Sequence, residues 1–354
     1  MAKSSPVVNP GVRKGFLFFL PVVSALLISA AYPPFDIEIL AWIGLAPLFY
    51  ALRRTGPVVG AGLSFMYGLL FVIGVFGWAI SVSEISLLSF FIWLIPSSLY
   101  FLVFGVLYRL FSRKTGSWIL IGAPALWVTL EYVRANLFFL AWPWNLLGHS
   151  QYLYLPVIQF ADIAGVYGIS FLMVMVNQVL SRAPELLSLR NKTSNNPPVE
   201  SNNWTVQLLL VVLALEIVLS YGWYRLGSPE SNKRLRVALV QGNRLVEDNM
   251  AYADRFEHLG VYEKLTINTA QKKPNLIIWP AASLPAPMST SRLVRYNVRR
   301  LARETKAYLL TGGAGFEKLK PKKEGYRAYS NSEFLISPSG RLEGQYNKIK
   351  LVPF

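Results

Sequence analysis

Long apolar runs alternate with short polar connections over the first two thirds of the chain. A helix needs about 20 apolar residues to cross the hydrocarbon core of a bilayer, and seven runs come near that length. They lie at residues 15–32, 38–52, 58–80, 85–110, 118–133, 165–180 and 206–223. This pattern predicts a polytopic α-helical membrane domain with seven transmembrane helices over residues 1–233.

From residue 234 the pattern changes to short strands and amphipathic helices. Residues 250–269 and 290–306 have the spacing of helices, and Gly312-Gly313 is expected to form a turn. Segments of alternating or continuous apolar residues that end at Gly, Pro or polar residues are predicted strands. They lie at residues 235–243, 275–279, 308–311, 329–336 and 342–346. The order of elements predicts an incomplete α/β sandwich over residues 234–354.

Composition supports this division and limits the chemistry. Hydrophobic residues make up 53% of the chain and charged residues 15%, which is typical of a membrane protein. The chain contains no cysteine, so disulfides, thiolate metal ligands and a thiol nucleophile within the chain are excluded. With only two histidines, we expect no metal site and no cofactor.

The basic residues predict a topology. Lys and Arg precede the first run, follow the second at Arg53-Arg54, and recur at residues 109–114 and 182–192, whereas the intervening connections hold almost none. By the positive-inside rule these segments face the cytoplasm. An odd number of spans then places everything after Arg225 outside the cytoplasm, where we expect no nucleic acid as a partner.

Two polar features interrupt the membrane half. Glu131 and Arg134 lie one helical turn apart, and isolated charges are costly in lipid. We expect them to form an ion pair; the alternative is that they line a polar cavity. The segment 141–151 contains Trp142, Trp144 and Gln151 and is predicted to lie at the membrane interface. It serves either as an aromatic anchor alone or as a contact for lipid.

Several short motifs, together with the seven runs, are familiar. They are Tyr32-Pro33-Pro34-Phe35, Pro143-Trp144, Trp279-Pro280 and Tyr346-x-Lys348-x-x-Leu351-Val352-Pro353-Phe354. The chain resembles the bacterial apolipoprotein N-acyltransferase family over essentially its whole length. The resemblance implies a multi-pass protein of the inner membrane, expected as a monomer, with a nitrilase-like periplasmic domain. It also implies transfer of an acyl chain from a phospholipid to the N-terminal diacylglyceryl-cysteine of lipoproteins.

The resemblance assigns site residues. Lys348 matches the catalytic lysine of the family, and we expect it within about 6–8 Å of residue 281, because charge interactions weaken with distance. Ala281 occupies the position of the family's glutamate, and the nucleophilic cysteine is absent. Trp142, Trp144, Gln151 and Trp279 are expected to contact lipid or substrate.

A chain without the thiol and this carboxylate is expected to be inactive on its own. It is then either a truncated or decayed copy of the enzyme or a noncatalytic membrane protein that binds lipid or lipoprotein. A transporter or channel is disfavoured, because the runs show neither paired mid-span charges nor an internal repeat.

Overall fold

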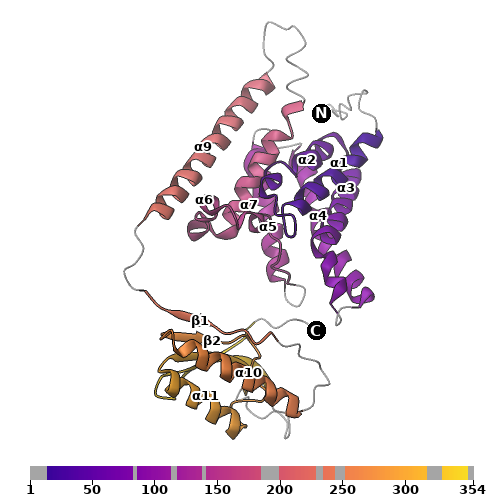
Figure 1. The fold of residues 1–354 in the computed structure, drawn as a ribbon. Coiled ribbons are helices and arrows are strands. Elements are labelled where there is room, and N and C mark those ends of the chain that lie inside the picture. Colours follow the sequence, from indigo (N-terminus) through magenta and orange to yellow (C-terminus); the bar gives the residue numbers. More distant parts are fainter. Residues whose placement is uncertain are drawn as a thin grey trace. The chain divides into compact units, whose positions relative to one another are not determined.

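The computed structural model of the chain describes residues 14–82, 86–112, 118–137, 141–184, 199–228, 234–243, 252–316 and 329–349. The chain divides into two compact units, Met1–Pro229 and Glu230–Phe354 (Figure 1). Each unit has a hydrophobic core of its own.

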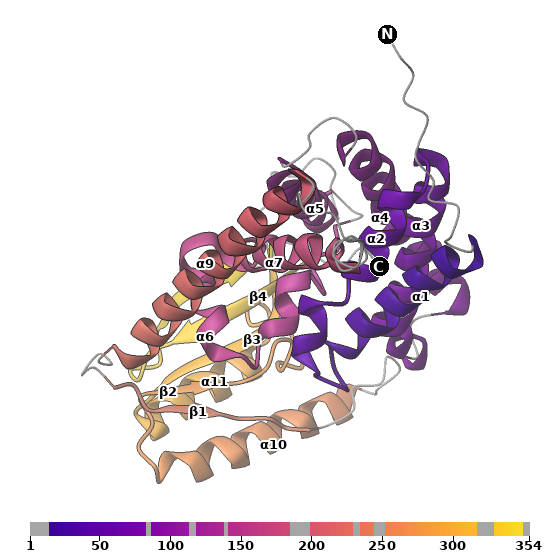
Figure 2. The same cartoon turned by 90° about the horizontal axis from the view of Figure 1, so that it is seen from above.

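The first unit is helical. Its α-helices are α1 Lys14–Ala30, α2 Ala46–Arg54, α3 Pro57–Phe76, α4 Leu87–Ser112, α5 Ile119–Asn136, α6 Leu155–Ile158, α7 Ala161–Leu180 and α9 Val199–Gly227. Among the described residues, 3-10 helices connect them at η1 Glu38–Trp42, η2 Gly77–Ser81 and η5 Leu147–Gln151. Figure 2 shows α1, α2, α3 and α4 packed side by side.

Four helical segments of the described chain are long and apolar enough to cross a membrane. They are Pro57–Ser81, Leu87–Ser112, Ala161–Leu180 and Asn203–Gly227. A fifth, Gly15–Ala30, is apolar but shorter. The expected span at residues 118–133 is the helix α5, which is not among the four and carries Glu131 and Arg134 in its second half.

The prediction of one continuous helix at residues 38–52 is wrong. The segment forms η1 and then α2, whose nine residues extend only about 14 Å at 1.5 Å per residue. Four residues of α2 are fully buried inside the unit, namely Leu48, Phe49, Ala51 and Leu52. Apolar composition here reflects burial in protein, which hydropathy alone does not distinguish from burial in lipid.

Aromatic rings form the centre of the helical core. Phe49 of α2 stacks on Tyr108 of α4 with ring centroids 5.4 Å apart, and Trp127 of α5 meets Phe104 of α4 edge-on at 5.0 Å. Gly105 of α4 lies so close to the backbone of α3 that a Cβ there would come within 2.7 Å of a carbonyl oxygen. The glycine therefore allows close packing of α3 and α4.

The described residues of the second unit form a five-stranded sheet of order β1-β2-β3-β4-β5. The strands are β1 Val237–Leu239, β2 Leu276–Ile278, β3 Tyr308–Phe316, β4 Tyr329–Ile336 and β5 Leu342–Asn347. The pairs β1–β2 and β2–β3 are parallel, whereas β3–β4 and β4–β5 are antiparallel. A helix lies in each parallel connection, α10 Tyr252–Ala270 and α11 Arg292–Thr305, as predicted.

The two helices cover one face of this sheet (Figures 1 and 2). Buried strand residues Ile277, Leu309 and Phe334 pack in one cluster with Val298 and Leu301 of α11. The alternate residues point to the other face, and several of their side chains are exposed. They include Val237, Leu239, Tyr308 and Tyr346.

The prediction of a turn at Gly312-Gly313 is wrong. β3 continues through both glycines to Phe316, and Gly312 pairs with Glu333 of β4. Glycine within a strand is tolerated where another part of the backbone approaches closely. Here a Cβ on Gly312 would lie 2.7 Å from the Cα atom of Ala281.

Candidate functional site

The segment after β2 folds over the glycines of β3. Ala282 adopts a left-handed conformation with φ of 57°, which turns the chain back toward the sheet. The backbone N–H of Leu284 then donates to the carbonyl of Gly312 at 3.0 Å. Ser283 adds a side-chain hydrogen bond of 3.1 Å between its Oγ atom and Oγ1 of Thr311. These contacts hold Ala281 against Gly312, on the face of the sheet opposite α10 and α11, where Ala281 is exposed.

Lys348 lies at the same end of the sheet as Ala281, where β2 and β5 both end. Because β2 is parallel to β3 and two antiparallel pairings follow, β5 runs in the direction of β2, and the residues after both strands share one edge. The backbone N–H of Lys348 donates to the carbonyl of Asn331 at 2.8 Å, and the side chain is exposed. Carboxyl ends of parallel strands are frequent sites of ligand binding in α/β sheets.

Lys348 and Ala281 are separated along the sheet by the spacing of its strands. Neighbouring strands lie about 4.8 Å apart. Ala281 contacts β3 at Gly312, and β5 is two strands further along, on the order of 10 Å away. A separation of about 6–8 Å between the two residues stays a prediction.

Sequence reasoning did not single out Glu333, a third polar residue of this region. It is the β4 partner of Gly312, and its Oε1 atom would lie 2.5 Å from a Cβ built on that glycine. Burial raises the pKa of its carboxyl above the ordinary value. Glu333 lies near Ala281 only because β4 pairs with β3 in this register. A sequence pattern within one segment therefore does not indicate that the two residues are close.

The described residues contain no cluster of three or more acidic or histidine side chains that could hold a metal ion. The whole chain lacks cysteine, so the site contains no thiol of its own. The residues present can supply a carboxylate from Glu333 and an ammonium group from Lys348. They can exchange a proton and stabilise negative charge, but they lack the sulfur nucleophile.

Trp279 lies in the core of the second unit. Its side chain is 2% exposed, its ring stacks on Tyr262 with centroids 5.0 Å apart, and its Nε1–H donates to Oγ1 of Thr266 at 2.9 Å. These contacts tie the end of β2 to α10. The residue therefore positions the strand that precedes Ala281.

In the helical unit, the expected ion pair between Glu131 and Arg134 is replaced by two separate contacts with the segment 141–151. Glu131 Oε1 accepts from the backbone N–H of Leu147 at 2.7 Å, while Arg134 donates to the carbonyls of Trp144 and Asn145 at 3.2 and 3.1 Å. Each charged side chain thus satisfies backbone groups of this loop. The loop is fixed at both of these points.

The loop presents its two tryptophans differently. Trp144 is 51% exposed and stacks on Trp78, which is also exposed, with centroids 6.3 Å apart. Trp142 is more enclosed and contacts the rings of Phe76 and Trp93. Exposed indole rings are typical of the membrane interface.

Gln151 is fully buried. Its Oε1 accepts from Nε1–H of Trp42 at 2.8 Å, and its Nε2 donates to the carbonyl of Glu38 at 2.9 Å. The side chain therefore joins η5 to η1. Its amide oxygen and nitrogen both form hydrogen bonds within the helical unit.

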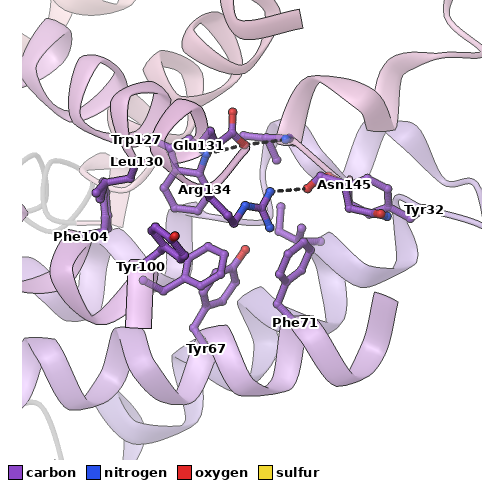
Figure 3. Close-up of a pocket in the computed structure, with 13 residues that line it drawn as sticks. Tyr32, Tyr67, Phe71, Tyr100, Phe104, Trp127, Leu130, Glu131, Arg134 and Asn145 are labelled. Carbon is purple, nitrogen blue, oxygen red and sulfur yellow. Dashed lines mark hydrogen bonds between the residues drawn. The ribbon is translucent and has the colours of Figure 1, made fainter. Parts of the chain in front are cut away.

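A small cavity lies beside Glu131 and Arg134, and Figure 3 shows the Tyr67 hydroxyl directed toward the Arg134 guanidinium. The cavity volume is about 20 Å³, which is room for about one water molecule. Tyr32, whose hydroxyl donates to the carbonyl of Leu146 at 2.9 Å, forms another part of the wall. The cavity in this form is too small for an acyl chain.

Comparison with known families matches both units. The model of the apolipoprotein N-acyltransferase N-terminal domain matches residues 24–179, and that of carbon-nitrogen hydrolases matches residues 236–353. Among solved structures, an amidase from Nesterenkonia sp. AN1 aligns with 33% of this chain and 45% of its own at 16% identity. Its TM-score of 0.26 is too low to support an argument.

Full-length relatives extend the match across the chain. The apolipoprotein N-acyltransferase of Geobacter metallireducens is 36% identical over 95% of this chain and 64% of its own length. Those of Chlorobaculum tepidum and Haemophilus influenzae are each 28% identical, over 95% and 97% of this chain. The chain spans about 64% of the length of these relatives. The two family models and these relatives together place the chain in the apolipoprotein N-acyltransferase family.

Proposed function

We propose that this chain is the membrane domain, residues 1–233, and part of the nitrilase-like domain, residues 234–354, of an apolipoprotein N-acyltransferase. The reaction moves an acyl chain from a phospholipid to the amino group of an N-terminal diacylglyceryl-cysteine. The observation that carries the proposal is the match to full-length relatives over 95% of this chain. Lys348, at the edge of the sheet shared with Ala281, is the candidate for stabilising the oxyanion.

The membrane unit is proposed to bring lipid to this chemistry. Trp144 and Trp78 form an exposed aromatic pair suited to the interface. Phospholipid is the expected acyl donor and a diacylated lipoprotein the acceptor. We propose that the protein lies in the bacterial inner membrane as a monomer, with the N-terminus in the cytoplasm and the second unit outside.

By itself this chain is proposed to be inactive in acyl transfer, since a thioester requires a thiol and the chain has none. The test incubates the purified chain with a diacylated lipoprotein in phospholipid micelles and measures triacylated product by mass spectrometry. The relative from Geobacter metallireducens serves as the positive control. Turnover by the isolated chain would contradict the proposal and direct attention to a serine or lysine nucleophile.

A noncatalytic role in binding lipid or lipoprotein is the second candidate. The exposed Trp144–Trp78 pair favours it, because this surface needs no nucleophile. The test measures binding of a diacylated lipoprotein to the chain in nanodiscs and compares wild type with Trp144→Ala. Binding that Trp144→Ala weakens would support the binding role over an inert copy of the enzyme. Equal absence of binding in both proteins would leave the binding role without support.

A further inference from the structure

The position after Trp279-Pro280 holds alanine, which can neither accept nor donate a proton. Acid–base catalysis requires a group within hydrogen-bonding reach of the proton that it moves. If this chain has the proposed function, on which this inference rests, another residue beside Ala281 has to move the proton.

Glu333 reaches the same place from another strand. A single point, the Cβ position of Gly312, lies 2.5 Å from Glu333 Oε1 and 2.7 Å from Ala281 Cα. The carboxylate oxygen and Ala281 therefore both lie against Gly312. Any side chain at residue 312 would occupy the space where they meet, so the glycine in the middle of β3 makes this arrangement possible.

The register explains why Glu333 points there. It pairs with Gly312 on β3 and with Tyr346 on β5, and paired residues share one face of a sheet. Lys348 lies two residues beyond Tyr346 and so belongs to the same face, in the diagonal position to Glu333. Diagonal neighbours lie about 7–8 Å apart, within reach of long side chains. Glu333 thus stands between Ala281 and Lys348.

Nothing in the described part of the chain engages this carboxylate. Glu333 makes no hydrogen bond and no ion pair among the residues that the structure describes, although its side chain is partly buried. A partly buried carboxylate with a structural role normally has a partner. The lack of one, and the raised pKa that burial causes, suit a group that exchanges a proton.

We propose that Glu333 supplies, from β4, the acid–base carboxylate that the site lacks at Ala281. The proton of a thiol passes to the Glu333 carboxylate, and the thiolate bonds to the carbonyl carbon of the phospholipid ester. When the tetrahedral adduct collapses, the ester C–O bond breaks and the proton returns from Glu333 to the leaving lysophospholipid oxygen. The co-reactant is a thiol that lies outside the cysteine-free residues 1–354.

The first test measures proximity and uses the absence of cysteine. In Ala281→Cys the new side chain is the only thiol of the full chain, so maleimide labelling followed by intact mass spectrometry reports on it alone. The thiol pKa is obtained from the pH dependence of labelling. A nearby negative charge disfavours the thiolate, so adding Glu333→Gln is expected to lower the thiol pKa by about 1 unit.

The matched control is Glu343→Gln in the same background. Glu343 lies at the register shift of β5, three residues before Tyr346 and about 10 Å along the strand, so the same change of charge is expected to leave the thiol pKa unchanged. Equal shifts from Glu333→Gln and Glu343→Gln, or no shift from either, would overturn the proposal, whatever the fate of the proposed function.

The second test measures chemistry in the relative from Geobacter metallireducens. Alanine at the position aligned with Ala281 is expected to lower formation of triacylated product about 100-fold or more. Adding glutamate and glycine at the positions aligned with Glu333 and Gly312 is expected to restore it at least tenfold. Glutamate placed instead at the position aligned with Asn331 is the control and should restore nothing.

The outcomes separate the two proposals. A thiol pKa shift in this chain without restored activity in the relative would reject the acid–base role of Glu333, while family membership and the proposed function would stand. Product formation by this chain alone would reject the proposed inactivity and leave the proximity result intact.

Discussion

The Oδ1 atom of Asn177 on α7 accepts a hydrogen bond from the backbone N–H of Leu45, the residue that precedes α2. The Asn177 Oδ1 atom lies 2.8 Å from Leu45 N and 2.9 Å from Ala46 N, and its Nδ2 donates to the carbonyls of Ala41 and Met173. A helix that begins inside a membrane unit has no water to satisfy these groups. The side-chain amide of Asn177 therefore stabilises the backbone where η1 ends and α2 begins.

Replacing Asn177 by alanine is expected to destabilise the helical unit by about 1–3 kcal/mol, because the buried N–H of Leu45 loses its acceptor, while the N–H of Ala46 keeps the carbonyl of Ile43. The loss is measured as a lower melting temperature of the full chain in detergent. Gln159→Ala is the control, since that amide donates only to a carbonyl of its own helix near the surface. Equal melting temperatures for Asn177→Ala and wild type would contradict the assignment.

Gly312→Ala is expected to cost about 1–3 kcal/mol, because the new methyl group would meet the backbone of Ala281 and the Glu333 carboxylate. Gly344→Ala on β5 is the matched control, as a Cβ there meets no atom within 4 Å. Urea unfolding followed by circular dichroism compares the two variants. If both behave alike, the close approach at Gly312 is not present in solution.

The raised pKa of Glu333 has a consequence for stability. The folded chain holds this proton more tightly than the unfolded chain, so the contribution is fully present below the unfolded value and is lost as pH rises through the folded one. Tyr308, Tyr346 and Lys348 are further titratable residues on that face. Melting temperatures of Glu333→Gln relative to wild type should therefore increase from pH 4.5 toward neutrality. A difference that is constant with pH would argue against burial of the carboxyl.

The charge pattern of the connections predicts that residues after Arg225 lie outside the cytoplasm. An alkaline phosphatase fusion at Lys233 should be active, and a fluorescent protein that folds only in the cytoplasm should stay dark there. Fusions at Arg54 provide the opposite control. The reverse result at both positions would invert the topology.

Sequence patterns located the elements of the second unit well, because strands and amphipathic helices are set by local alternation. They failed where partners distant in the chain decide the outcome. Residues 38–52 form two short helices because Asn177 satisfies the break, and β3 continues through Gly312 because Glu333 pairs with it. Glu131 and Arg134 turn to the loop instead of each other for the same reason.

Glu333 itself illustrates the limit for the site. Position 281 is recognised from adjacent residues, since it follows Trp279-Pro280 directly. The carboxylate beside it is separated by 52 positions and is brought there by the pairing of β4 with β3. No spacing rule within one segment encodes that relationship.

The two outer strands of the described sheet differ in how they are protected from joining another sheet. β1 is only three residues long, whereas β5 is longer, exposes Leu342 and Tyr346, and has the charged residues Arg341, Glu343 and Lys348 along it. Short length and charge are both known to hinder edge-to-edge pairing. Because salt screens charge but does not change length, aggregation of concentrated preparations should begin at β5 and at high ionic strength.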